Sequence, residues 1–563
     1  MPSIIRKGWT TRIAFILLLV LLWLVYLSCS RAFCVQGISF LCMNDFHAAV
    51  EPLSAGWLER AGTAGGAVCV AAHVERFRKD HPNTLWVVTG DVFMGHYLDS
   101  LTQGKAMIEF LNLIPPDCYV LGNHEFDYGL DVLAERIRDA RFPIVCANIR
   151  KGEGGTLVKP FIIHEMEGIR VLVIGVICRN LAEIVLPGRL GDLEVTDPVQ
   201  SILQCTDSLD STIDLTVVLS HSGLSADRRI AAALPPSSGV DIIIGGHSHD
   251  LMEKTETVNG IIICQAGSKG RYLGHLAVDM EPGKGLITAH SWDLIPTLCE
   301  GMSHPKVAQW LEGRLQGTAG GMEEVIGTLE GEWTREAEAI EWPIADFATD
   351  AIAEQTGAEI GIYNRGGIRK GLSGPYIRIK DVWEMFPFGN HLVQFCLTGR
   401  QVKILLERHL SFAGEHLFFS GGLRYTFNPK RPSGARCISA TVNGKPLDPD
   451  RLYTIATVEF LWGHSGSAFG LRQAAIKENG GFREYPGLIE RDIIINRIKR
   501  LKHIRPQTDG RVKVVTDPLT FLFFDGVPFQ SPEFLAPFPA RSDSSSQSLA
   551  TPPVIPLPAR YPG

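Results

Sequence analysis

Short apolar runs rich in β-branched residues alternate with amphipathic stretches over the first half of the chain. Each run has the length of one strand and ends in polar or glycine-containing positions. The clearest runs are ISFLCM (38–43), TLWVVT (84–89), CYVL (118–121), IRVLVIGVI (169–177), LTVVLS (215–220) and DIIIG (241–245). Helical periodicity lies between them, at 66–77, 107–112 and 130–139. Such alternation is typical of a layered α/β domain.

The pattern changes at several points and divides the chain into segments. A short helical pattern followed by the loose GTAGGM predicts a linker helix that acts as a hinge, and a second α/β or α+β unit follows it. The Ser- and Pro-rich end cannot build a core and predicts disorder. The expected segments are a signal peptide or signal-anchor at 1–36, a first domain at 37–300, the linker at 301–325, a second domain at 326–514 and a disordered tail at 515–563.

The N-terminus has the composition of a targeting segment. Arg6, Lys7 and Arg12 precede an unbroken apolar run at 13–27. That run is shorter than the ~20 residues that span a bilayer comfortably, and its basic flank favours a secretory signal. We therefore expect an exported protein, either periplasmic or at the cell surface. Membrane association through an uncleaved N-terminal segment stays open.

Composition excludes several classes of protein. The 563 residues are 45% hydrophobic and 20% charged, which allows sizeable cores and excludes wholesale disorder. The net charge of −7 argues against a nucleic acid polymer as partner. The 12 cysteines contain no CxxC pair, which excludes a thiolate zinc ribbon and a disulfide-dense scaffold.

Potential metal ligands follow five of the apolar runs. They are Asp45 and His47, Asp91, Asn123, His221, and His247 with His249. Each motif alone is usually structural, but five in order after five strands favour a metal site at the carboxyl edge of a sheet. Imidazole and carboxylate without thiolate suit zinc, manganese, cobalt, nickel or iron. Seven donors exceed one tetrahedral ion and suffice for two ions that share a carboxylate.

The order D-x-H, GD, GNHE, H, GH-x-H resembles that of the calcineurin-like metallophosphoesterases. The fuller motifs NDFHAAVEP (44–52), GNHEFDYG (122–129), GGHSHD (245–250) and NRGGIR (364–369) resemble the 5′-nucleotidase family, which includes ecto-5′-nucleotidase and periplasmic UDP-sugar hydrolases. The resemblance covers about residues 38–510. It implies an α/β fold: an N-terminal four-layer αββα metallophosphoesterase sandwich plus a C-terminal α/β substrate-binding domain.

The resemblance also implies roles for the metal ligands, with two divalent ions such as Zn²⁺, Mn²⁺ or Co²⁺. The first ion is held by Asp45, His47, Asp91 and His249. The second is held by Asp91, Asn123, His221 and His247. Many relatives have Asn or Gln in place of His249. His124 is not a ligand in this scheme; it stabilises charge on the phosphoryl group, and Asp127 orients its ring.

The second unit is expected to bind the substrate. Asn364, Arg365, Gly367 and Arg369 follow the apolar run EIGIY, and guanidinium groups suit phosphate. By resemblance, Phe388 and Phe460 stack on the two faces of a nucleobase.

Two departures from the family pattern concern substrate binding. Relatives carry an acid in the loop after the second aromatic residue, whereas residues 461–467 have none, so Trp462 or His464 is a candidate replacement. Relatives with an extra arginine near 355–358 also differ from this chain, which has Gln-Thr-Gly-Ala there.

The resulting hypothesis is an exported dimetal 5′-nucleotidase that cleaves the phosphate ester of a small-molecule nucleotide with metal-activated water. A 2′,3′-cyclic-nucleotide 2′-phosphodiesterase/3′-nucleotidase and a UDP-sugar hydrolase remain alternatives. A thiosulfohydrolase of similar architecture is a weaker one. The non-enzyme alternative is a catalytically silent nucleotide-binding surface protein.

Overall fold

The computed structural model describes residues 36–59, 62–152, 155–208, 212–281, 285–318, 320–335, 339–411 and 416–516. The predicted signal segment, apart from Gln36, and nearly all of the predicted tail lie outside these ranges. Within them, no helix combines the length and the apolar composition needed to cross a membrane. The segment boundaries given above stay predictions.

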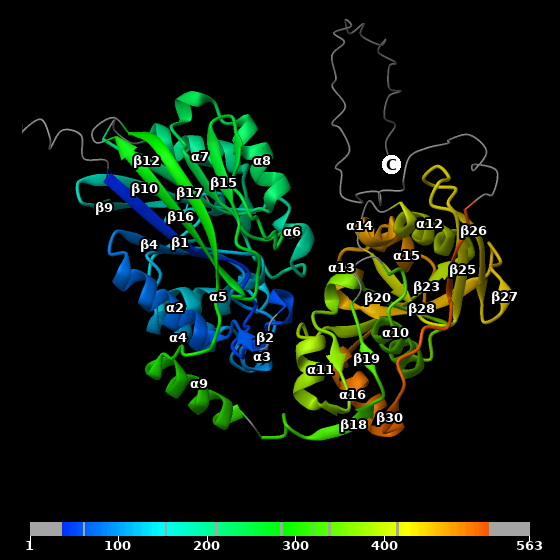
Figure 1. Ribbon diagram of the computed structural model, residues 1–563. Coiled ribbons are helices and arrows are strands. Elements are labelled where there is room, and N and C mark those ends of the chain that lie inside the picture. The colour runs from blue at the N-terminus through cyan, green and yellow to red at the C-terminus, as the bar shows by residue number, and fades with distance from the viewer. Residues whose placement is uncertain are drawn as a thin grey trace, which may run out of the picture. The chain divides into compact units, whose positions relative to one another are not determined.

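The N-terminal part is built on two six-stranded sheets (Figure 1). The first has the order β17 (Leu286–Pro296), β16 (Tyr272–Glu281), β1 (Gln36–Met43), β4 (Thr84–Thr89), β5 (Cys118–Val120) and β6 (Ile144–Val145). The second has the order β14 (Glu256–Val258), β15 (Ile261–Cys264), β13 (Ile242–Ile244), β12 (Leu215–His221), β10 (Ile169–Ile177) and β9 (Phe161–Met166). Strands β1, β4, β5 and β6 run parallel, as do β10, β12, β13 and β15.

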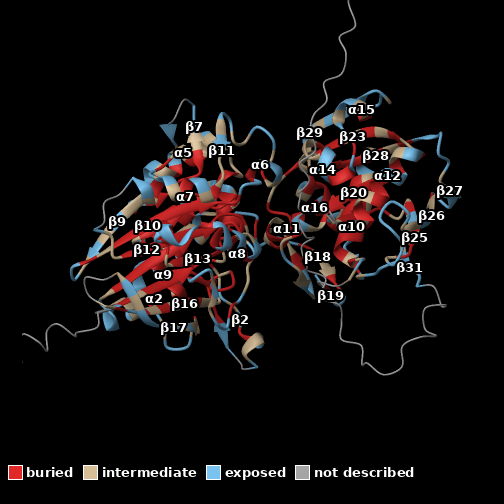
Figure 2. Ribbon diagram, turned by 90° about the horizontal axis from the view of Figure 1, so that it is seen from above, coloured by how far each residue is buried: buried red, intermediate tan, exposed pale blue. Residues whose placement is uncertain are grey.

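Helices cover the outer face of each sheet. The first sheet packs under α2 (Ala67–Asp80), α4 (Lys105–Leu113), α5 (Leu130–Asp139) and α9 (Pro305–Thr318). The second packs under α7 (Pro198–Asp207) and α8 (Leu224–Ala233). Alternation along β1 serves both layers, because Leu41 and Met43 meet the helices while Phe40 and Cys42 meet the second sheet. The predicted αββα sandwich is confirmed, and Figure 2 shows its buried interior.

The C-terminal part has one continuous core around a five-stranded sheet. The sheet order is β24 (Leu417–Phe419), β20 (Ile360–Asn364), β28 (Leu452–Val458), β23 (His391–Thr398) and β29 (Arg483–Ile489). The helices are α10 (Pro343–Thr356), α11 (Ile379–Met385), α12 (Gly399–Leu410), α13 (Glu459–Gly463), α14 (Ser465–Phe469), α15 (Gln473–Lys477) and α16 (Glu490–Leu501). Smaller sheets combine β27 (Lys445–Pro446), β26 (Cys437–Val442), β25 (Leu423–Phe427) and β31 (Val512–Val514), and β22 (Tyr376–Arg378), β18 (Val325–Leu329) and β30 (His503–Ile504). This α/β unit also agrees with the prediction.

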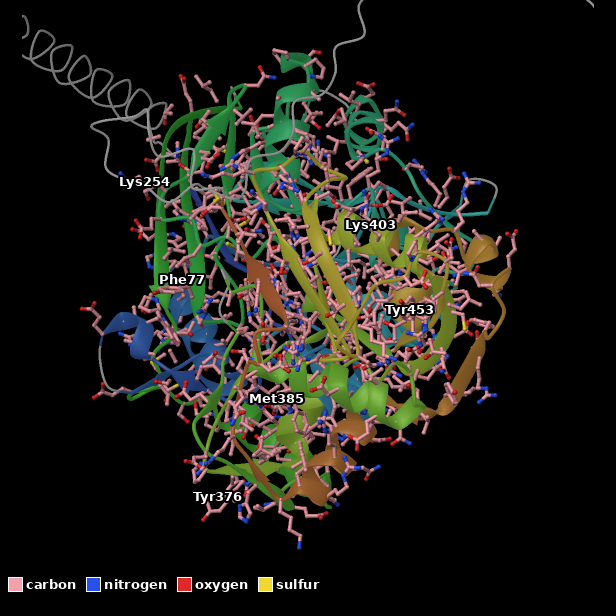
Figure 3. All side chains as sticks on the ribbon, turned by 90° about the vertical axis from the view of Figure 1, so that its right-hand side faces the viewer. Phe77, Lys254, Tyr376, Met385, Lys403 and Tyr453 are labelled. Atoms are coloured by element: carbon pink, nitrogen blue, oxygen red, sulfur yellow. A yellow bond between two sulfur atoms is a disulfide. The ribbon has the colours of Figure 1, made fainter. Side chains whose placement is uncertain are left out.

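Local sequence explains where the main helices of this part begin and end. Thr398 and Gln401 form a reciprocal capping box at the start of α12. Helix α10 starts with Pro343 in its first turn and ends at Gly357, whose φ of 69° favours glycine. Figure 3 labels Met385, which is buried, and Tyr376, which is 52% exposed at the edge of β22.

One disulfide joins α2 of the N-terminal part to the segment after β17. Cys69 in α2 pairs with Cys299, and their Cα atoms lie 5.2 Å apart although 230 positions separate them in sequence. No spacing motif in the sequence indicates this bridge. It fixes α2 and the end of β17 to each other in the folded and unfolded chain.

Removing the disulfide is expected to lower the free energy of unfolding by about 2–4 kcal/mol, because the cross-link restricts the unfolded chain. The double variant Cys69→Ser/Cys299→Ser tests this by urea denaturation. Cys437→Ser is the matched control, since Cys437 is a free, partly exposed thiol. Equal unfolding midpoints for the double variant and the parent would contradict the expectation.

Candidate dimetal active site

The structure brings all seven predicted metal ligands to one edge of the two sheets. Strands β1, β4 and β5 are parallel neighbours, and so are β12 and β13, so their carboxyl ends meet. The ligands lie after β1 (Asp45, His47), after β4 (Asp91), after β5 (Asn123), at the end of β12 (His221) and after β13 (His247, His249). The ligands on the first four of these elements are buried, and the two histidines after β13 line the cavity described below.

The first group surrounds Asp45, a fully buried carboxylate. Its Oδ1 lies 3.4 Å from Nε2 of His249 and 3.9 Å from Nε2 of His47. The two Nε2 atoms lie 2.9 Å apart. One oxygen and two imidazole nitrogens at these separations form a set of donors that one metal ion can bind together.

The second group is centred on Asn123 and Asp91. Oδ1 of Asn123 lies 2.8 Å from Nδ1 of His247 and 3.3 Å from Nε2 of His221. Oδ2 of Asp91 lies 3.2 Å from Nε2 of His221 and 4.0 Å from Nε2 of His47. Asp91 therefore faces both groups, which is the position of a bridging carboxylate.

Protonation at the site also suits cations. Burial lowers the pKa of His47 and takes the pKa of His247 to about 4, so both imidazoles are neutral near pH 7 and keep a lone pair. Burial also disfavours the imidazolium of His221, but the Asp91 carboxylate outweighs burial and raises its pKa to about 10. The site thus attracts positive charge and offers free nitrogen donors, which fits divalent metal ions.

The ligand residues have an unusual backbone conformation. Positive φ occurs at Asp45 (52°), His47 (48°), Asp91 (52°), His247 (77°) and His249 (59°). Non-glycine residues adopt this region rarely, at a cost of about 1–3 kcal/mol each, and such strain clusters at functional sites. The glycines of the same motifs allow close packing: a Cβ at Gly122 would lie 2.3 Å from Oδ1 of Asp91.

Glu125 fixes the Asp91 loop, a role that the sequence did not indicate. This buried carboxylate accepts hydrogen bonds from the backbone N–H of Gly122 at 2.6 Å and of Asp91 at 3.0 Å. It also accepts from Val92 at 2.9 Å. It therefore ties the loop after β4 to the loop after β5, and so holds Asp91 beside Asn123.

His124 and Asp127 form a dyad next to the two ligand groups. Nδ1 of His124 lies 2.5 Å from Oδ2 of Asp127, and the backbone N–H of His124 donates to Oδ1 of Asp91 at 2.9 Å. Burial disfavours the imidazolium of His124, but Asp91 and Asp127 raise its pKa. Nη2 of Arg369 lies 3.5 Å from Nε2 of His124. The dyad thus places an oriented imidazole, with an increased tendency to hold a proton, beside the candidate metal site.

A cavity of about 300 Å³ opens beside the ligand groups, within the range of small-molecule sites. Five of the six predicted substrate residues line it: Asn364, Gly367, Arg369, Phe388 and Phe460. Arg365 does not; its guanidinium stacks on Trp342 at 4.5 Å. The ring of Phe388 lies 5.8 Å from that of His124, so the cavity continues from the ligand groups to an aromatic side chain.

The two candidate replacements for the missing acid do not line this cavity. Trp462 is 6% exposed and packs between Phe395 and Phe482. His464 lies with Nδ1 2.9 Å from the carbonyl oxygen of Phe460. Their positions do not support the interpretation of either as an anchor for sugar hydroxyls.

Glu490 is a second buried carboxylate that sequence patterns did not indicate. It is 0% exposed and accepts from the hydroxyl of Tyr363 at 2.8 Å and from the backbone N–H of Asn390 at 3.2 Å. Burial raises its pKa to about 7. Tyr363 precedes the NRGGIR turn and Asn390 follows Phe388, so Glu490 connects the two segments that line the cavity.

Comparisons with known proteins agree with both parts of the fold. A family model described as calcineurin-like phosphoesterase matches residues 38–251, and one described as 5′-nucleotidase, C-terminal domain, matches residues 325–471. The two models together match more than half of the chain. An apyrase of Tabanus yao is 25% identical, covering 85% of this chain and 94% of the relative. A snake venom 5′-nucleotidase of Gloydius brevicauda is also 25% identical, covering 88% and 90%.

Solved structures show the same architecture over almost the whole described chain. A 5′-nucleotidase precursor of Thermus thermophilus has a TM-score of 0.76 and 27% identity, covering 86% of this chain and 100% of that one. The Thermus thermophilus sulfate thiohydrolase SoxB, at 19% identity and a TM-score of 0.71, shares the fold. The family models, the relatives and the donor groups at the sheet edge all lead to one assignment. The chain belongs to the 5′-nucleotidase family of the calcineurin-like metallophosphoesterases, a family of metal-dependent phosphoester hydrolases.

Proposed function

We propose that the protein is an exported 5′-nucleotidase that hydrolyses nucleotides at a centre of two divalent metal ions, Zn²⁺, Mn²⁺ or Co²⁺. The observation that carries the proposal is the convergence of the seven donors into two groups that share Asp91. The adjoining cavity has Arg369 and His124 near these groups and aromatic side chains further along. A phosphate at one end and a nucleobase at the other fit this arrangement.

The chain's own residues would act on the phosphoryl group. Two divalent cations bound at such a site supply an activated water and neutralise phosphoryl charge. His124, held by Asp127, would donate hydrogen bonds to the phosphoryl oxygens and stabilise charge that develops during in-line displacement. Arg369 would bind the same group, because its Nη2 lies 3.5 Å from Nε2 of His124.

Export is supported by covalent structure as well as by the N-terminal sequence. Structural disulfides persist in oxidising compartments, and Cys69 and Cys299 form one. The similarity to a 5′-nucleotidase from snake venom is consistent with that location. Fractionation of cells that express the full chain, followed by N-terminal sequencing, tests both export and cleavage.

A substrate panel tests the proposed activity. The full chain with Mn²⁺, Zn²⁺ or Co²⁺ is given AMP, 3′-AMP, 2′,3′-cyclic AMP, UDP-glucose and p-nitrophenyl phosphate. Metal-dependent release of phosphate from AMP is the expected result. Preferential cleavage of 2′,3′-cyclic AMP, 3′-AMP or UDP-glucose would replace the proposal by the corresponding alternative. Tight nucleotide binding without any hydrolysis would identify a silent binding protein.

Alanine at Phe388 or Phe460 is expected to raise KM for AMP about ten- to hundredfold, since stacking contributes roughly 1–3 kcal/mol per base. Hydrolysis of p-nitrophenyl phosphate, which has no nucleobase, should change little. Steady-state kinetics with both substrates makes the comparison, and Phe482→Ala is the control because Phe482 packs on Trp462 away from the cavity. Equal losses on both substrates would show that the rings act through the core.

A further inference from the structure

The segment 181–190 of the N-terminal part lines the substrate cavity, although no motif marked it. Four of its residues face the cavity: Glu183, Ile184, Leu186 and Arg189. Leu181 and Val185, in and just after α6 (Leu181–Ile184), are 0% and 1% exposed in the core under the first sheet. These two buried side chains hold the backbone of the segment against the core, while its other side chains named above face the cavity.

Arg189 brings a second cation to the catalytic end of the cavity. A Cβ at Gly129 would lie 3.4 Å from its Nη1, so the guanidinium rests on the backbone two residues after Asp127. Among the described residues, no carboxylate lies within ion-pair distance of Arg189. A guanidinium with its donors free in such a cavity suits a phosphate oxygen pair.

In the proposed function, the phosphoryl group that is hydrolysed is bound by the guanidinium of Arg369. Arg369 approaches His124 to 3.5 Å, at the position where the hydrolysed phosphate would lie. Arg189 comes from a different element and lines the same space. Two separate guanidinium groups along one cavity match a ligand with two phosphoryl groups better than a ligand with one.

Glu183 brings a negative charge to the cavity, in contrast to Arg189 and Arg369. It lines the cavity, is exposed, and has no cation within ion-pair distance in the described part of the chain. The neighbouring cavity acid, Glu459, is already bound, since its Oε2 lies 2.9 Å from Nδ1 of His391. A carboxylate repels phosphate and accepts hydrogen bonds from hydroxyls, so Glu183 is suited to a sugar diol.

The same segment also reaches the helix that carries Phe460. A Cβ at Gly463 in α13 would lie 2.7 Å from Cγ of Pro187, and Nε2 of His464 lies 3.4 Å from the carbonyl oxygen of Ala182. A ligand that extends from His124 to Phe460 therefore passes along the segment.

We infer that residues 181–190 form a substrate-recognition loop in which Arg189 binds a second phosphoryl group and Glu183 binds sugar hydroxyls. The preferred substrates are then nucleotides with two phosphoryl groups, either nucleoside 5′-diphosphates or nucleoside 3′,5′-bisphosphates. The inference rests on the proposed function for the site of hydrolysis. It adds the class of nucleotide.

Equilibrium binding tests the role of Arg189 without relying on turnover. Calorimetry on the Mn²⁺-loaded full chain compares α,β-methylene-ADP with the hydrolysis-resistant 5′-phosphonate analogues of AMP and of adenosine 3′,5′-bisphosphate, which stand in for these esters below. Arg189→Gln is expected to weaken binding of a two-phosphate ligand about tenfold or more and of AMP less than about twofold, because a charge-assisted contact is lost. Arg189→Lys should restore part of the affinity. The two-phosphate ligand whose affinity falls more identifies whether Arg189 binds the phosphate of a 5′-diphosphate or that of a 3′,5′-bisphosphate.

Arg179→Gln is the matched control. Arg179 lies just before the same segment, but its guanidinium pairs with Asp197 at 2.9 Å and does not line the cavity. Its substitution should leave all three affinities unchanged. Equal losses of AMP and two-phosphate binding in Arg189→Gln, or no loss of either, would overturn the role of Arg189.

Glu183→Gln is tested with a different ligand pair. It should weaken binding of the 5′-phosphonate analogue of AMP about fivefold or more and leave the affinity for the 2′,3′-dideoxy form of that analogue unchanged, since only the former offers the hydroxyls. Equal effects on both ligands would overturn this role. If the parent protein hydrolyses no nucleotide, the proposed function fails, whereas these binding ratios still decide the recognition loop.

Discussion

Asp91→Asn is expected to abolish phosphohydrolase activity, by at least about 10³-fold, and to lower the metal content at both sites, because a bridging carboxylate neutralises two cations at once. Asp91 is the residue whose Oδ2 faces both His47 and His221. Asparagine keeps the shape and can still accept the hydrogen bond that His124 N–H donates to Oδ1. The loss can therefore be assigned to charge and ligation.

Elemental analysis and turnover of AMP are measured on the same preparation of the Asp91 variant. Asp293→Asn is the control, since that exposed carboxylate lies on β17 away from the ligand groups. Two metal ions per chain together with parental turnover in Asp91→Asn would refute the shared-carboxylate scheme. Circular dichroism at low temperature checks that the variant keeps the fold.

His124→Ala is expected to lower kcat by about 10²–10⁴-fold while bound metal stays nearly constant. The side chain lies beside the donor groups, with Nε2 3.9 Å from Oδ2 of Asp91, but its Nδ1 is engaged by Asp127. Removing it takes away an oriented donor to the phosphoryl group and leaves the seven donors in place.

Single-turnover kinetics and metal analysis separate the two roles of His124. Asp127→Asn should give a smaller loss of kcat, since the imidazole remains and only its orienting acceptor is weakened. A metal content that falls in proportion to the rate of His124→Ala would make His124 a ligand instead. Rescue of rate by added metal would support the same reversal.

The candidate metal site was predictable because its proposed ligands lie at strand ends. Asp45 and Asp91 lie two residues after an apolar strand, His221 ends another, and parallel strands bring such ends to one edge. The alternation of Phe40 and Leu41 between two buried faces likewise follows from the strand period. Local pattern therefore indicated a layered α/β domain and the order of the candidate ligands, whereas the four-layer arrangement followed from the family resemblance.

Contacts between distant segments were not predictable in the same way. Cys69 and Cys299 lie 230 positions apart, and Glu490 reaches Tyr363 from a helix near the end of the second domain. Nothing in the spacing of Glu125 shows that its carboxylate accepts from two loops, because only the folded backbone directs those N–H groups towards it. Trp462 was a candidate for hydroxyl binding, but packing against Phe395 and Phe482 places it in the core.

At the proposed ligand residues, the left-handed backbone lowers the stability of the metal-free chain, while the side chains there are needed for activity. Glycine at His249, whose φ is 59°, would remove a ligand and relieve strain of about 1 kcal/mol or more in the metal-free chain. The same conflict exists at His47 and His247. Selection for melting temperature alone, without metal, would therefore accumulate inactive chains at these positions. Screening with metal present reverses the pressure, because only chains that retain the ligands gain stability from binding.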